Sequence, residues 1–425
     1  MNEYIQTIKS LFRHPELRKR ALITLFLLLI FRLMANVPLP GVDLERIKNI
    51  LSSNQFLGLL NVFSGSALSN FSIVLLGVAP YITSVIILQL LTLVYPRFKE
   101  MYYEEGEEGR RKFNQLARLI TIPLAMIQSF GFLNFLRLQG ILIIPSYLNL
   151  LRDVIIITAG CVSLMWIGEL ISEQKLSNGI SLIIFSGIVA SLPVTLQQII
   201  ATLSVEKLTI YLIFIILALL VIAAIIFINE AERRIPLTFA KRVRGMRLYG
   251  GASTYIPLRI NQAGVIPIIF AISILLFPAT IAQILSATKL PSVENIIKII
   301  NSFIQNQILF SLFYFILVFA FTYLYTYIVF NPQELAQNFQ KSGAFIPGIR
   351  PGKETEDFMK KVVNRITFWG ALFLSFVAIL PFIFQAITKT QFLAIGGTSI
   401  LIVVSVAIET LKQIRSDLSL RRYEI

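Results

Sequence analysis

Ten long apolar stretches constrain this chain more than any other feature of its sequence. A helix needs about 20 mostly apolar residues to cross about 30 Å of hydrocarbon. Backbone groups inside lipid must satisfy one another, and no stretch alternates with the period of two that a barrel strand requires. The sequence therefore predicts an all-α integral membrane protein with ten transmembrane helices. The predicted spans are 21–37, 71–95, 114–136, 153–172, 179–203, 208–229, 263–286, 307–330, 366–386 and 392–412.

Composition supports this class of protein and limits its chemistry. The chain is 56% apolar and 14% charged, whereas soluble domains carry about 25% charged residues. Its one cysteine, Cys161, excludes an internal disulfide and is typical of a small buried side chain. The lone His14 cannot form a metal site by itself. Arg18, Lys19 and Arg20 precede the first stretch, and no small-residue cleavage site follows it, so we expect a retained span.

The basic residues predict the orientation of the chain in the membrane. With the N-terminus in the cytoplasm, about 28 of the 38 lysines and arginines fall in cytoplasmic segments. This bias places both termini in the cytoplasm. Arg32 and Arg118 lie inside predicted spans, and Arg32 is close enough to the outer end of its span to reach the interface.

Two short motifs occur twice. The pattern G-V-x-P-x-I occupies 77–82 and 264–269, in the second and seventh spans, and G-x-S-x-x-I occupies 179–184 and 397–402, in the fifth and tenth. Each match is weak alone, but together they pair the spans in order. The expected architecture is two five-span halves, of opposite orientation because five is odd, with a path between them. These halves are 1–205 and 206–425.

The repeated motifs place branched apolar side chains at equivalent positions. Val78 and Ile82 lie four residues apart on one helical face, and the other three motifs supply matching residues. A ring of such side chains excludes water when empty and can yield to a passing polypeptide. Each residue could equally face lipid or the protein core. Pro80 and Pro267 either kink their helices or are ordinary membrane-helix prolines.

The segment 38–70 is half apolar and too polar to span a membrane. Its part at about 57–68 is predicted to fold back as a plug under the path, or to lie in the interface as an amphipathic helix.

Two long cytoplasmic loops, about 230–262 and 331–365, carry clusters of arginine. They are candidates for docking an anionic partner, although part of this charge is explained by membrane orientation. Arg350 is distinct because turn residues flank it, which indicates a positioned contact. The docking candidates are Arg233, Arg234, Arg242, Arg244, Arg247 and Arg350.

No phosphate-binding loop of the form G-x-x-x-x-G-K-[ST] and no nucleophile–base pair is apparent. We therefore expect neither an enzyme nor a cofactor or metal, and the energy for transport must come from a partner or a gradient.

Many ordered motifs together resemble the SecY/Sec61-alpha family of protein-translocon channel subunits over essentially the full chain. The motifs are Val37-Pro38-Leu39-Pro40-Gly41-Val42-Asp43, Phe63-Ser64-Gly65-Ser66-Ala67-Leu68-Ser69, Pro80-Tyr81-Ile82, Asn178-Gly179-Ile180-Ser181, Asn261-Gln262-Ala263-Gly264-Val265-Ile266-Pro267, Leu276-Phe277-Pro278-Ala279-Thr280-Ile281, Phe330-Asn331-Pro332, Gly343 to Gly352 and Gly396-Gly397-Thr398-Ser399.

This resemblance implies a channel that conducts unfolded secretory chains and releases transmembrane segments through a lateral gate. The implied pore ring is Val78, Ile82, Ile184, Ile269, Ile281 and Ile402; the plug includes Leu60, Phe63, Ser64 and Gly65; the lateral gate includes Thr83 and Phe277. Implied partners are SecE, SecG, the motor ATPase SecA, the ribosome, signal peptides, preproteins and lipids of the bacterial plasma membrane. A secondary transporter and a membrane scaffold are the alternatives; a transporter requires polar groups near the midplane.

Overall fold

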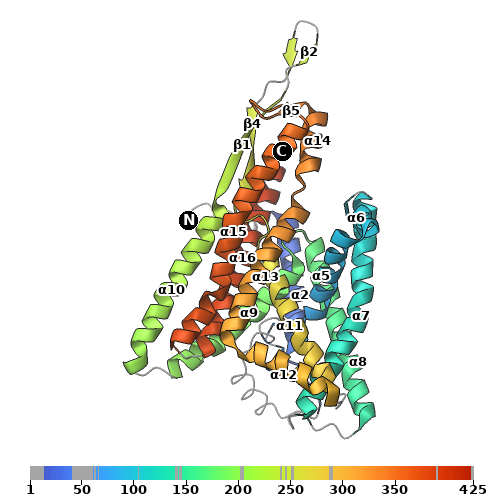
Figure 1. Cartoon of the computed structure of the whole chain (residues 1–425), viewed down its shortest axis with the longest axis vertical. Coiled ribbons are helices and arrows are strands. Elements are labelled where there is room, and N and C mark those ends of the chain that lie inside the picture. Colours follow the sequence, from blue (N-terminus) through green and yellow to red (C-terminus); the bar gives the residue numbers. More distant parts are fainter. Residues whose placement is uncertain are drawn as a thin grey trace.

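The computed structural model describes residues 14–40, 61, 64–65, 67–103, 105–138, 142, 146–201, 205–239, 242–244, 247–249, 253–286, 291–388 and 391–422. Most of these residues are helical (Figure 1). The helices are α2 (Pro15–Ala35), α5 (Ala79–Val94), α6 (Pro96–Tyr103), α7 (Gly106–Leu138), α8 (Tyr147–Glu173), α9 (Gly179–Ala201), α10 (Val205–Glu230), α11 (Ile266–Ser286), α12 (Pro291–Gln305), α13 (Gln307–Val329), α14 (Pro332–Ser342), α15 (Lys353–Thr388) and α16 (Gln391–Arg422).

Each of the ten predicted spans overlaps one described helix, namely α2, α5, α7, α8, α9, α10, α11, α13, α15 and α16. Among the described residues, α7, α8, α13 and α15 are long and apolar enough to cross a membrane, and α5 with α6 adds a fifth if that bent pair is one span. The chain is thus a multi-pass membrane protein, and the count of ten spans stays a prediction.

The second predicted span differs from the structure at its start. Residues 71–78 form consecutive turns, and the helix α5 begins only at Ala79. Phe71 and Gly77 have φ values of 44° and 58°, in the left-handed region that interrupts a helix. At its other end, α5 bends by 111° into α6 at Pro96. The predicted start of this span at 71 was therefore wrong, whereas its predicted end at 95 agrees with the end of α5 at Val94.

Pro80 and Pro267 do not kink their helices. Pro80 lies in the first turn of α5, and Pro267 is the second residue of α11. At such positions the missing proline N–H has no helical partner to lose, so proline favours helix initiation. The prolines inside helices are instead Pro123, Pro193, Pro278 and Pro381.

The repeated motif G-V-x-P-x-I has the same backbone at both of its positions. Gly77 and Gly264 have φ values of 58° and 62°, and each precedes a buried valine and then the first residue of a helix. The amide of Ile82 donates to the carbonyl of Val78 at 3.1 Å, and that of Ile269 to Val265 at 3.3 Å. The second motif is less regular, because Gly179 begins α9 whereas Gly397 lies within α16.

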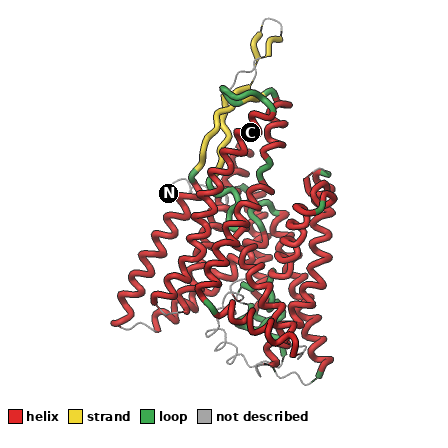
Figure 2. The backbone as a smooth tube through the Cα atoms, viewed as in Figure 1, coloured by secondary structure: helices red, strands yellow, loops and turns green. Residues whose placement is uncertain are grey.

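The two long loops are not irregular, so the prediction of an all-α protein was wrong outside the helical bundle. The strand β1 (Glu232–Phe239) pairs antiparallel with β4 (Ser253–Arg259) and with the short β5 (Ala344–Phe345). A hairpin of β2 (Arg242–Arg244) and β3 (Arg247–Tyr249) stands apart. Since β5 follows α14, one sheet joins both loops. Figure 2 shows these strands extending beyond one end of the bundle, which we call the sheet end.

A separate apolar core fixes this sheet to the bundle. Ile235, Leu237 and Leu258 pack with Met359 and Val362 of α15. The helix α14 is bounded by Asn331, whose side chain accepts a hydrogen bond from the Gln333 amide, and by Gly343 in the left-handed conformation. The two loops therefore form a single ordered unit.

Contacts between the two predicted halves follow the pairing of the motifs. The helix α5 packs against α11, and α9 packs against α16. Arg20 of α2 and Asp417 of α16 form an ion pair of 3.2 Å. These contacts put helices far apart in sequence on the two sides of one interface.

The helix α12 was not predicted, because its composition is too polar for a span. Ile296 and Ile299 are exposed on its apolar side, and Glu294 and Lys298 form an ion pair on the other. It lies at the end of the bundle opposite the sheet (Figure 1).

Candidate functional site

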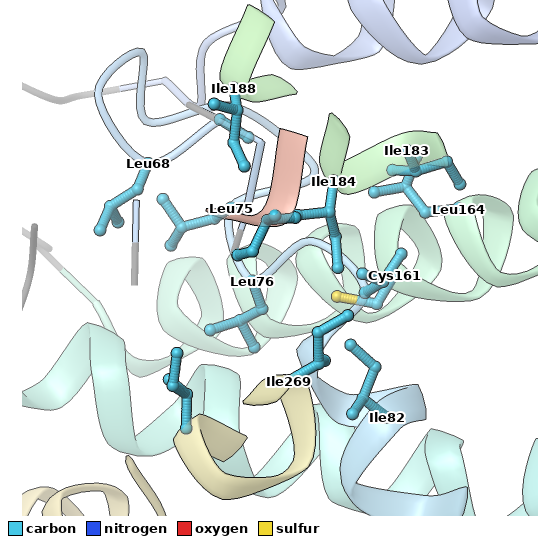
Figure 3. Packing of buried hydrophobic residues seen from close by; sticks show 14 of the residues in the cluster. Leu68, Leu75, Leu76, Ile82, Cys161, Leu164, Ile183, Ile184, Ile188 and Ile269 are labelled. Carbon is cyan, nitrogen blue, oxygen red and sulfur yellow. The ribbon is translucent and has the colours of Figure 1, made fainter. Parts of the chain in front are cut away.

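Five of the six predicted ring residues are buried in the large apolar core of the bundle. Val78 lies at the start of α5 and Ile82 within it, while Ile184, Ile269 and Ile402 come from α9, α11 and α16. None of these five side chains is more than 4% exposed. Figure 3 shows Ile82, Ile184 and Ile269 close to one another and to Leu75 and Leu76. Residues separated by more than 300 positions are thus gathered in an apolar centre.

Ile281 is placed differently. Its side chain is 36% exposed, and it is not part of this cluster. It lies twelve residues beyond Ile269 on α11, a little over three helical turns further along.

Sequence reasoning missed the turns of residues 67–78 as part of this centre. Leu68, Leu75 and Leu76 are buried in the same cluster, and so is Cys161 of α8 (Figure 3). The position of Cys161 confirms that it is a small buried side chain. The only signal for the turns was the unusual density of apolar residues directly before Gly77.

The predicted plug residues lie partly outside the described residues. Leu60 and Phe63 fall there, whereas Ser64 and Gly65 are described. The Ser64 hydroxyl donates to the carbonyl of Asn61 at 3.0 Å and accepts from the amide of Leu68 at 3.1 Å. These bonds stabilise a tight turn directly before the apolar centre.

The predicted gate residues lie on helices that face each other across the two halves. Thr83 of α5 is buried and donates to the carbonyl of Ala79 at 2.9 Å. Phe277 of α11 is 39% exposed. Both α5 and α7 pack against α11, so this seam is closed by helix contacts.

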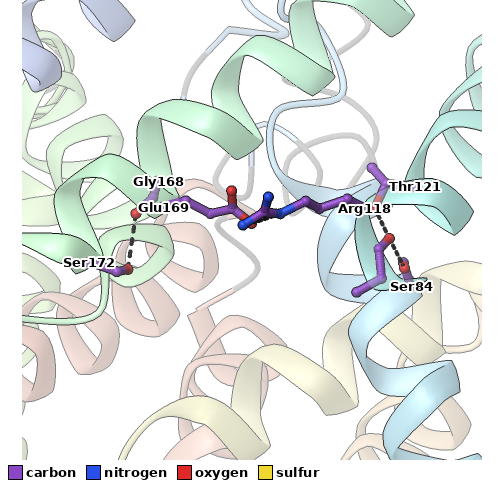
Figure 4. Close-up of polar contacts among 7 residues, drawn as sticks. Ser84, Arg118, Thr121, Gly168, Glu169 and Ser172 are labelled. Carbon is purple, nitrogen blue, oxygen red and sulfur yellow. Dashed lines mark hydrogen bonds and ion pairs between the residues drawn. The ribbon is translucent and has the colours of Figure 1, made fainter. Parts of the chain in front are cut away.

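An ion pair inside the bundle was not foreseen. Arg118 Nε of α7 lies 2.7 Å from Glu169 Oε1 of α8 (Figure 4). Beside it, the Ser84 hydroxyl of α5 donates to the carbonyl of Ala117. The charge that weakened the third predicted span is therefore compensated by a neighbouring helix.

The docking candidates are carried by the sheet and by the turn after β5. Arg233 and Arg234 are exposed on β1. Arg234 bonds Glu232 at 2.9 Å and lies 4.8 Å from the ring centre of Tyr255. The hydrogen bond that Arg234 donates to the Glu232 carboxylate raises the pKa of Arg234 above its ordinary value. This guanidinium is therefore oriented as well as charged.

The remaining docking candidates lie further out. Arg242, Arg244 and Arg247 belong to the β2–β3 hairpin, in which Arg244 opposes Arg247. Arg350 is exposed in a turn whose carbonyl accepts a hydrogen bond from the Thr355 hydroxyl at 2.8 Å. Gly348 and Gly352, two residues on either side, have φ values of 83° and 104°. Two left-handed glycines thus shape the backbone that presents this arginine.

Polar side chains gather in a pocket of about 140 Å³ at the sheet end. Lys412 Nζ donates to the carbonyl of Asn229, and the Asn261 amide donates to the Asn229 side chain at 2.8 Å. Glu409 and Ser405 complete this side of the pocket. Within the described residues, no group of three or more His, Cys, Asp or Glu side chains could hold a metal ion.

The helical bundle, with its apolar centre of branched side chains and a basic sheet at one end, defines the chain as a multi-pass membrane protein. The family model described as SecY matches residues 72–411. A protein translocase subunit SecY of Thermotoga maritima is 42% identical over 432 residues, covering 99% of this chain and 97% of the relative. The chain therefore belongs to the SecY family.

Solved structures share the fold. A SecY protein whose plug domain stabilises the closed state of the translocation channel aligns with a TM-score of 0.64 at 19% identity, covering 93% of this chain and 91% of that one. Sec61 in a canine ribosome–channel complex aligns with a TM-score of 0.60 at 16% identity, with the same coverage.

Proposed function

We propose that this chain is the channel subunit of a protein translocase, conducting unfolded polypeptides across the membrane and releasing transmembrane segments sideways into lipid. The observation that carries the proposal is the buried cluster of Val78, Ile82, Ile184, Ile269 and Ile402 in a member of the SecY family. Branched apolar side chains from four helices exclude water and ions while they touch.

The apolar centre favours a polypeptide-conducting channel over a secondary transporter. A carrier needs ionisable or polar groups at its binding site. A polar pocket lies at the sheet end, between α10, α11, α13 and α16, and none of the five residues of the apolar centre lines it. An apolar ring has no chemical preference among side chains, which suits a substrate of variable sequence.

Within this function, the turns around Ser64 and Gly65 act as the plug. The seam between α5, α7, α11 and α13 is the lateral gate, with Thr83 and Phe277 at it. Ile281 joins the ring only in another arrangement of α11, since its side chain is 36% exposed in this one. The ten spans form two inverted halves, 1–205 and 206–425.

The proposed setting is the bacterial plasma membrane, with both termini and the sheet end in the cytoplasm. There the arginines of β1, the β2–β3 hairpin and Arg350 would dock SecA or the ribosome. SecE and SecG are the proposed subunits, and signal peptides and preproteins are the clients. The likeness to Sec61 in a ribosome–channel complex supports the ribosome as a partner.

A stalled secretory chain tests the path. Cys161 is first replaced by alanine, because its side chain lies in the same cluster and would compete for the probe. Ile82→Cys and Ile402→Cys are then introduced separately, and crosslinks to a cysteine in the stalled chain are measured. We expect adducts at both positions, since both side chains belong to the proposed constriction.

The matched control is Ile216→Cys, because Ile216 of α10 is 59% exposed on the bundle surface. It should form no adduct. If the stalled chain remains bound but crosslinks only to Ile216→Cys, or to none of the three, the path does not pass through this cluster.

A further inference from the structure

Arg32 links three segments that are distant in sequence. It lies in the last turn of α2, where its side chain is partly buried. Its Nη1 donates to the carbonyl of Gly65 at 2.8 Å, and its Nη2 donates to the carbonyl of Gly187 in α9 at 3.2 Å. One guanidinium therefore bridges the plug turn and a helix that supplies a ring residue, Ile184.

The backbones at this bridge are in direct contact. A Cβ added to Gly187 would lie 2.1 Å from the Cα of Gly65, and one added to Gly65 would lie 2.7 Å from the Phe31 ring. Gly65 also has a φ of 66°, which disfavours other residues. Only glycine at both positions lets the two carbonyls reach one arginine.

The chain following Gly65 is bound to the end of α2 by further hydrogen bonds. The amide of Leu39 donates to the carbonyl of Phe71 at 2.9 Å, and that of Ile73 donates to Val37 at 3.0 Å. The Asn70 amide group donates to the Asn36 side chain at 2.9 Å. These bonds hold residues 70–73 to the end of α2, and the Arg32 bridge and the glycine contact join the plug turn to α9.

The chemistry of this bridge is specific to arginine. A guanidinium offers several donors in one plane, so it serves two carbonyls at once, whereas an ammonium is a point donor on a flexible stem. Bonds with a charged donor are about twice as strong as neutral ones. A charge near lipid also needs such partners. Arg32 is therefore more than an interfacial residue that reaches water.

We propose that Arg32 is a positioning residue that holds the plug turn against α9 and so keeps the empty channel closed. The inference rests on the proposed channel function and names the contact that must break when the plug turn moves. In the closed state, Arg32 binds the carbonyls of Gly65 and Gly187. On opening, both carbonyls and the guanidinium exchange these bonds for water.

The first test is the ion conductance of the resting translocon in a planar bilayer. Arg32→Leu removes both bonds, and we expect the open probability without substrate to rise about tenfold, equivalent to about 1.4 kcal/mol. Arg32→Lys keeps the positive charge but loses the planar set of N–H donors. Its open probability should lie between that of Arg32→Leu and that of the unaltered protein. The matched control is Arg137→Leu, because Arg137 is an exposed arginine in the last turn of α7 that stacks on Tyr147. It should conduct like the unaltered protein.

A second substitution disrupts the same contact without changing any charge. Gly187→Ala introduces a methyl group where the Gly65 backbone now lies, so it should displace the plug turn and raise resting conductance as well. If both substitutions act on one contact, the double variant Arg32→Leu with Gly187→Ala should leak little more than the stronger single variant. If the two substitutions instead raise the conductance by independent factors that multiply, they do not act on one shared contact.

Translocation into vesicles reconstituted with the same protein preparations separates this inference from the proposed function. The inference fails if Arg32→Leu translocates and its resting conductance equals that of Arg137→Leu. If the unaltered protein, assembled with its subunits and motor, moves no polypeptide, the proposed function itself fails. If Arg32→Leu assembles poorly, it is replaced by Gly187→Ala, for which a higher resting conductance is also expected.

Discussion

The proposed pore ring consists of branched side chains at the centre of the bundle, which would exclude water only while they contact one another. Val78, Ile82, Ile184, Ile269 and Ile402 are all at most 4% exposed. A polar atom placed there without a partner costs about 1–3 kcal/mol, and water relieves that cost by entering. The seal is therefore sensitive to polarity and tolerant of small changes in volume.

Replacing Ile82 and Ile402 by asparagine together should hydrate the centre. We expect the resting ion conductance in a planar bilayer to rise about tenfold or more, since two unpaired amides destabilise the dry state. The control pair Ile82→Val and Ile402→Val should leave conductance unchanged, because Val78 already occupies an equivalent place. Unchanged conductance of the asparagine pair would remove these residues from the ring.

The repeated motifs mark equivalent positions in two halves, and all five of these side chains are buried in one apolar core; that they form a pore ring stays a prediction. The sequence did not place Leu75 and Leu76 at the centre, since nothing in their pattern distinguishes a buried turn from the start of a span. Nor did it predict the bonds of Arg32 to Gly65 and Gly187. Such contacts depend on backbone approach between distant segments, which periodicity does not encode.

At the scale of elements, glycine and proline decide where the helices of the centre begin. Gly77 and Gly264 adopt the left-handed conformation directly before α5 and α11. The sheet was missed for a related reason: β1 has an alternating pair in Ile235 and Leu237, but arginines surround it. Its partner β5 lies about a hundred residues further along the chain, so neither strand is recognisable alone.

Substitutions at Gly264 measure how much the left-handed backbone before α11 contributes to stability. An added Cβ there would meet only Glu409, at 3.7 Å, so Gly264→Ala should destabilise the protein by conformation alone. The expected cost is about 1–2 kcal/mol, read as a lower Tm in detergent. Gly264→Asn should recover part of this loss, because asparagine tolerates the left-handed region. Equal Tm values for all three proteins would contradict this account of the helix start.

At the scale of the whole molecule, the main feature is a basic surface at the sheet end. The chain has a formal net charge of +15, and the sheet end presents exposed arginines on an ordered unit formed by both long loops. The sequence predicted two basic loops but not their union, which arises from the pairing of β1 with β5 and the shared core on α15. Two loops joined by one sheet present a more defined docking surface than two separate loops.

Arg350→Glu tests that surface at the level of the assembled translocase. The turn around Arg350 is fixed by left-handed glycines and the Thr355 bond, so the substitution reverses a charge without removing a backbone contact. We expect slower motor-driven translocation into reconstituted vesicles, with subunit assembly intact, because an acidic partner surface would be repelled. The matched reversal is Lys298→Glu on α12, at the opposite end of the bundle, which should translocate normally. Equal rates for the two variants would exclude Arg350 from docking, whereas a loss confined to Arg350→Glu would place the motor at the sheet end.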